Sequence, residues 1–154
     1  MTLKFVVGDA TNPESDTDLK IIAHGCNNVG AWGAGFVLAL SRKWDAPEES
    51  YKELDFDTLE GGETQLVKCE PGIYVANIIT QTLHTSHPVR YDWLRLGFQR
   101  LDYFARTTTL STSIHMPRIG CGLGGGRWSV VESLIREYFS SETDITVYDL
   151  PKRG

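Results

Sequence analysis

Apolar residues along the chain follow two spacings, which predict short strands that alternate with amphipathic helices. Short apolar runs bounded by turn residues are typical of buried strands. Such runs predict strands at residues 3–7, 19–23, 64–69, 73–79, 113–119 and 145–148. Apolar residues spaced three and four apart predict helices at residues 36–44, 91–106 and 128–139.

Turn and capping signals refine this pattern. Asp45 is expected to cap one further helix, with Pro47 in its first turn. Glu70-Pro71-Gly72 is a tight-turn signature between two strands, which predicts an antiparallel pair. Because strands otherwise alternate with helices, the other strands are expected to be parallel, with helices on both faces of the sheet. At 154 residues, the chain is expected to form a single layered α/β domain.

Two glycine-rich loops follow predicted strands. The first extends over residues 24–35, and the second has five glycines within residues 120–126. Glycine leaves backbone N–H groups uncovered and permits positive φ, and a loop of this kind before a helix can bind an anion. Because the carboxyl ends of parallel strands meet at one edge, both loops are expected on the same rim of the sheet. The second loop is therefore predicted to hold a phosphate group.

Composition excludes several classes of partner. The net charge of −5 argues against a broad nucleic-acid surface, although a small anion can bind backbone donors without a basic protein. The three cysteines, Cys26, Cys69 and Cys121, are widely spaced, which supports neither a disulfide framework nor a structural zinc site. The beginning of the chain does not resemble a signal peptide, and no apolar run is long enough to span a bilayer. We expect a cytoplasmic protein that needs no metal or cofactor and does not associate with membranes.

One motif has a competing interpretation. Residues 120–125 match G-x-G-x-x-G between a strand and a helix, and Asp149 ends the following strand. A dinucleotide-binding fold would place a ribose on Asp149. However, that fold normally opens with the motif, whereas here it precedes the last predicted strand. A single match of this pattern is weak evidence, so this interpretation is disfavoured.

Four motifs taken together resemble the macrodomain family. They are V-G-D-A-T at 7–11, I-A-H-G-C-N at 22–27, W-G-A-G at 32–35 and M-P-R-I-G-C-G at 116–122. The resemblance extends over residues 3–150 and is closest to the branch that contains yeast-type ADP-ribose 1''-phosphate phosphatases and terminal ADP-ribose protein glycohydrolases. It implies a three-layer α/β/α fold with a mixed, mostly parallel central sheet whose rim binds ADP-ribose.

The resemblance also implies roles for individual residues. Asp9 would accept the adenine amino group beside the backbone of Ala10, and Asn28 would approach the distal ribose. His24 and Asn27 are the candidate catalytic residues, with His24 assisting proton transfer at that ribose. The remaining candidate ligand-binding residues form two loops around the diphosphate: Trp32, Gly33, Ala34 and Gly35 in the first, and Ile119, Gly120, Cys121, Gly122, Leu123 and Gly124 in the second.

Each polar candidate also has a purely structural alternative. Asp9 could be a turn residue, Asn27 and Asn28 could be turn formers, and His24 could be a buried histidine. Trp32 could belong to the core rather than to the ligand site.

Two positions depart from the glycohydrolase pattern. Those enzymes have a lysine and an aspartate where this sequence has Gln81 and Gly124. Gln81 cannot form a Schiff base and Gly124 supplies no acid, so the lysine mechanism is not supported. The predicted activity is hydrolysis of ADP-ribose 1''-phosphate to ADP-ribose and phosphate. The alternatives are a non-catalytic ADP-ribose reader, which could bind ADP-ribosylated macromolecules, and a hydrolase of another ADP-ribose ester, such as a mono-ADP-ribosyl group or O-acetyl-ADP-ribose.

Overall fold

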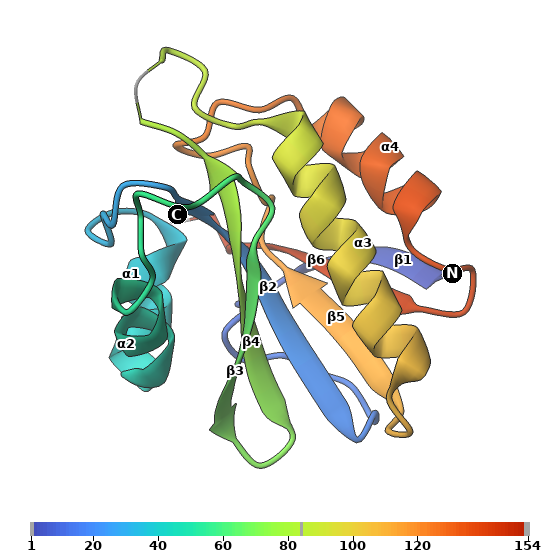
Figure 1. Cartoon of the computed structure of the whole chain (residues 1–154). Helices are drawn as coiled ribbons and strands as arrows, with labels where there is room; N and C mark the ends of the chain where they lie inside the picture. The colour runs from blue at the N-terminus through green and yellow to red at the C-terminus, as the bar shows by residue number, and fades with distance from the viewer. Residues whose placement is uncertain (1, 84, 153–154) are drawn as a thin grey trace.

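A computed structural model describes residues 2–83 and 85–152, which build one six-stranded sheet in the order β1-β6-β5-β2-β4-β3 (Figure 1). The strands are β1 Thr2–Val7, β2 Leu19–Asn27, β3 Thr64–Glu70, β4 Ile73–Gln81, β5 Thr112–Met116 and β6 Asp144–Asp149. The β3–β4 pair is antiparallel and the other four pairs are parallel. The mixed, mostly parallel sheet is therefore confirmed, and five strands present their carboxyl ends at one edge.

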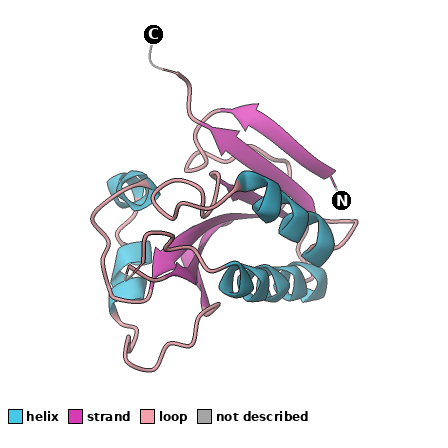
Figure 2. Cartoon of the chain, turned by 90° about the horizontal axis from the view of Figure 1, so that it is seen from above, coloured by secondary structure: helices cyan, strands magenta, loops and turns pink. Residues whose placement is uncertain are grey.

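Helices cover both faces of the sheet. They are α1 Phe36–Lys43, α2 Ala46–Lys52, α3 Tyr91–Thr107 and α4 Trp128–Tyr138. Helices α1 and α2 lie on one side, and α3 and α4 lie on the other (Figures 1 and 2). The expected three layers are confirmed. Within the described ranges, no helix has the length and apolar character required to cross a bilayer.

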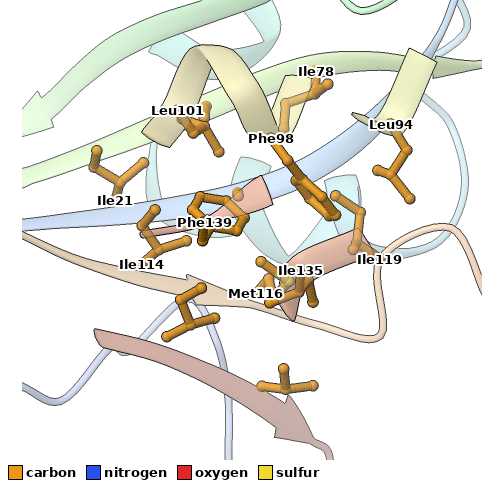
Figure 3. Packing of buried hydrophobic residues seen from close by; sticks show 14 of the residues in the cluster. Ile21, Ile78, Leu94, Phe98, Leu101, Ile114, Met116, Ile119, Ile135 and Phe139 are labelled. Atoms are coloured by element: carbon orange, nitrogen blue, oxygen red, sulfur yellow. The ribbon is translucent and has the colours of Figure 1, made fainter. Parts of the chain in front are cut away.

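The two helical layers enclose separate cores because successive strand residues point to opposite faces. On β2, Ile21 and Ala23 pack toward α3 and α4, whereas Ile22 and Cys26 pack toward α1 and α2. Figure 3 shows the first core, in which Phe98 of α3 and Phe139 lie against the isoleucines of the sheet. Burial on both faces explains why β2 and β4 have apolar residues at successive positions, as in Ile21-Ile22-Ala23 and Ile78-Ile79.

Two strands end elsewhere than expected, and one expected helix cap lacks its side-chain bond. Strand β2 does not end at Ala23, because its pairing with β4 continues to Asn27. Strand β5 ends at Met116 rather than at residue 119, since Pro117 follows and has no N–H to donate to a sheet. Asp45 stands at the N-cap position of α2, as expected, but its backbone is helical and its side chain makes no capping hydrogen bond.

Candidate functional site

A cleft lies at the carboxyl edge of the sheet and has two connected lobes. The large lobe, of about 500 Å³, lies among the start of α1, the loop after β5 and the end of β6. The small lobe, of about 250 Å³, lies beneath the loop that joins β2 to α1. Five residues line both lobes: Gly25, Ala34, Val37, Gln81 and Leu123. The two predicted glycine-rich loops therefore do face each other across one cavity.

The start of α1 forms the first wall. Gly35 precedes the helix with φ 80° and ψ −146°, and no side chain caps the first N–H groups of α1. Because these groups carry the positive end of the helix dipole, this wall is suited to an anion. Gly33 has open space where a Cβ would be, whereas a Cβ on Gly35 would lie 3.3 Å from Cδ1 of Leu123. Leu123 thus reaches across the cleft from the opposite loop.

The loop after β5 forms the second wall and is held by backbone hydrogen bonds. The N–H of Gly126 donates to the carbonyl of Gly120 (2.7 Å), and the N–H of Val89 donates to the carbonyl of Gly124 (3.0 Å). Gly120 has φ 77°, a conformation that favours glycine. Cys121 belongs to the loop but lines neither lobe, and burial raises the pKa of its thiol. These features suit a loop that binds through its backbone and not through a thiolate nucleophile.

His24 lines the large lobe but is almost wholly buried. Its side chain points into the α1/α2 layer, where the residue is 1% exposed and contacts the rings of Trp32 and Phe36. The His24 Nε2 is 2.6 Å from Oδ1 of Asn77, whose own amide group donates to the carbonyl of Pro47. This arrangement makes Nε2 the protonated nitrogen, since Oδ1 can only accept. That His24 transfers a proton stays a prediction. The contacts of His24 favour a role in positioning the residues around it.

Desolvation lowers the pKa of His24 to about 4. The residue is therefore neutral at pH 7. Its Nδ1 is buried and has no hydrogen-bond partner among the described residues.

Asn27 holds the loop between β2 and α1 in shape. Its Oδ1 accepts hydrogen bonds from the N–H groups of Val29 and Ala31 and from the Tyr51 hydroxyl, while its Nδ2 donates to the Ala31 carbonyl. Asn27 lines the small lobe, but its amide is already engaged. Asn28 lines neither lobe, and its Oδ1 is buried without a partner in the described chain. The turn-forming alternative thus describes Asn27 well.

Trp32 is mostly a core residue with one side at the small lobe. It is 7% exposed, its indole N–H donates to the Ser41 hydroxyl (2.8 Å), and its ring packs on Tyr51.

Asp9 lies just beyond the large lobe, in a neighbouring hollow that shares Tyr148 with it. One Asp9 oxygen accepts both the N–H and the hydroxyl of Thr11, so the other remains available to a ligand. Ala10 beside it is buried.

An ion pair that the sequence analysis did not identify lines the large lobe. The guanidinium of Arg118 donates to both carboxylate oxygens of Asp149, at 2.9 and 2.8 Å, and lies over the rings of Phe5 and Trp128. The pair lowers the pKa of Asp149 and raises that of Arg118. Because Arg118 follows β5 and Asp149 ends the adjacent parallel strand β6, their proximity could have been predicted from strand order. The pairing leaves Asp149 poorly suited to the ribose role of a dinucleotide-binding fold.

Comparison with solved structures identifies the family. A macrodomain protein from Streptomyces coelicolor is 41% identical to this chain and superimposes with a TM-score of 0.80, over 96% of this chain and 98% of that one. The chain belongs to the macrodomain family. No family model matches it.

Curated relatives agree with the branch that the motifs indicate. ADP-ribose glycohydrolase OARD1 of Bos taurus is 29% identical over 96% of this macrodomain and 91% of the relative. An ADP-ribose 1''-phosphate phosphatase of Lodderomyces elongisporus is 24% identical over 97% of this macrodomain and 100% of the relative. A chromodomain-helicase-DNA-binding protein 1-like protein of Danio rerio is 28% identical over 99% of this macrodomain, which spans 16% of that longer protein.

Proposed function

We propose that this macrodomain binds ADP-ribose in the cleft, with the diphosphate between its two glycine-rich walls. The observation that carries the proposal is the uncapped start of α1, which faces the backbone-lined loop at residues 120–124 across a continuous cavity. Two lobes joined at this point suit a ligand with a sugar on either side of a diphosphate. The adenosine half would occupy the large lobe near Tyr148 and Asp9, and the distal ribose would occupy the small lobe.

We further propose hydrolysis at the distal ribose. With ADP-ribose 1''-phosphate, water would attack phosphorus, the bond from phosphorus to the ribose oxygen would break, and that oxygen would take a proton. Backbone N–H groups would stabilise the developing charge, and the tight loops would orient the reactants. An uncharged ester at the same carbon is the second candidate substrate, because no charged side chain lines the small lobe among the described residues. The names of the two full-length relatives support a hydrolase in both cases.

In this proposal His24 and Asn27 act as positioning residues. His24 would support the floor of the site, and Asn27 would hold the loop that carries Trp32, Gly33 and Ala34.

A cytoplasmic location is also proposed, and the free thiols of all three cysteines support it.

The experiment is a panel of ADP-ribose derivatives measured for binding by calorimetry and for product by chromatography. We expect ADP-ribose to bind and at least one substituted derivative to be converted to ADP-ribose. Binding without conversion of any derivative would identify a reader of ADP-ribosylated macromolecules instead. Absence of ADP-ribose binding would refute the whole proposal.

A further inference from the structure

The small lobe offers few polar side chains to a ligand. Its lining includes no Asp, Glu, Lys, Arg or His side chain from the described residues. Asn27 and the Trp32 indole are engaged within the protein, as described above. Burial raises the pKa of the Cys26 thiol, which therefore stays protonated. Gln81 is the remaining polar side chain on this wall.

The backbone of Gln81 is fixed on both sides. It pairs with Asn27 at the end of β2, its carbonyl accepts the N–H of Asn28 (3.1 Å), and an isolated bridge joins it to Val89. The carboxamide makes no hydrogen bond to another described residue, and Gln81 lines both lobes. A rigid backbone thus presents an unengaged donor and acceptor at the junction between the lobes.

Gly124 is complementary to Gln81. A Cβ at position 124 would lie 2.9 Å from Oε1 of Gln81 and 2.7 Å from the carbonyl oxygen of Gly120. Real Cβ atoms do not approach other atoms this closely, so the backbone carbonyl of Gly120 excludes a side chain at 124, and the end of the Gln81 side chain lies against bare backbone. At this junction the chain thus has an uncharged amide packed on bare backbone.

We infer that Gln81 determines specificity in the small lobe and that the lobe selects an uncharged substituent on the distal ribose. The inference rests on the proposed function. A dianionic phosphate placed there would lie near the diphosphate of the same ligand, with no cationic side chain of the lobe to offset the repulsion. Neither a hydroxyl nor an ester meets such repulsion. A hydroxyl can use both the donor and the acceptor of the carboxamide, and an ester carbonyl can accept from its N–H group. The uncharged ester thereby becomes the preferred one of the two candidate substrates.

The test compares the dissociation constants of ADP-ribose and ADP-ribose 1''-phosphate by calorimetry. The wild-type protein should bind ADP-ribose at least about tenfold more tightly than the 1''-phosphate. Gln81→Lys should change that ratio by about tenfold or more in favour of the phosphate, whereas Gln81→Glu should change it in the opposite direction. Gln99→Lys is the matched control, because it makes the same exchange at an exposed position of α3 and should leave the ratio unchanged.

The outcomes distinguish the proposed function from the inferred specificity. Failure of the wild-type protein to bind ADP-ribose contradicts the proposed function. If ADP-ribose binds but the 1''-phosphate binds as tightly or more tightly, the inferred charge preference is wrong. If Gln81→Lys and Gln81→Glu both keep the wild-type ratio, Gln81 is not the determinant. Thermal unfolding of each variant establishes that it is folded before its binding is interpreted.

Discussion

The buried, neutral state of His24 predicts that the protein loses stability in mild acid. Burial lowers the pKa of His24 to about 4, compared with about 6.5 for histidine in an unfolded chain. The unfolded chain therefore binds the proton more tightly. The stabilisation from neutral His24 is fully present above about pH 6.5 and is lost as the pH falls toward 4. Protonation would add a proton at Nδ1, which has no partner in this apolar layer.

The magnitude follows from the interval between the two pKa values. Because one pH unit corresponds to about 1.4 kcal/mol, complete protonation of the unfolded chain over this interval removes up to about 3 kcal/mol from the free energy of unfolding. That is a large part of the 5–15 kcal/mol, roughly, by which domains are stable. Desolvation also lowers the pKa of His115 to about 4, so His115 adds a loss of the same sign.

The assay is urea unfolding, followed by tryptophan fluorescence, at several pH values between 7.5 and 4. His24→Gln is the informative variant, because its amide can still donate to Asn77 but cannot titrate. Between pH 7.5 and 4, the wild-type protein should lose up to about 3 kcal/mol more than this variant. Exposed His87 provides the control, since His87→Gln should follow the wild-type curve. Parallel curves for the wild type and His24→Gln would refute the assignment of a buried neutral histidine.

Three other substitutions test the cleft. Gly35→Ala should weaken ADP-ribose binding more than about tenfold in calorimetry, because position 35 has positive φ and a Cβ there would crowd Leu123. Unchanged affinity would argue against the start of α1 as the diphosphate site. Asp9→Asn preserves an oxygen for the local turn, so a loss of about tenfold in ADP-ribose affinity would report the ligand contact alone, and wild-type affinity would remove Asp9 from the adenine site. Asp149→Asn should cost about 1 kcal/mol or less in urea unfolding, and less in high salt, because its pairing with Arg118 is substantially exposed; a larger, salt-independent loss would contradict this.

Most of the fold could be predicted from the spacing of apolar residues and the placement of glycines, because both signals lie in residues that are neighbours in the sequence. Strands β3 and β4, with the Pro71-Gly72 turn between them, formed the expected antiparallel pair. The ends of elements were less predictable, since they depend on pairing across the sheet. Strand β2 continues to Asn27 because β4 is available beside it, a fact that no local pattern contains.

The glycine walls of the site were predictable for the same reason, whereas the roles of its polar residues were not. The partner of His24 is Asn77, which is far away in the sequence, and Asn77 is held in turn by Pro47. Burial and hydrogen-bond saturation are properties of the packed protein, so neither could be derived from the motif at 22–27. The ion pair of Arg118 with Asp149 required the order of strands, which the sequence analysis did not assign.

Leu123 has a consequence for the rate of ligand exchange. It is 67% exposed, yet it lines both lobes and reaches the position of Gly35 across the cleft. Exposed side chains change rotamer within picoseconds to nanoseconds, far faster than a ligand arrives by diffusion. Leu123, as an exposed side chain that covers this part of the cleft, therefore does not delay entry of a ligand. Once a diphosphate lies beneath it, the leucine displaces water from above the backbone donors and strengthens their attraction for the anion.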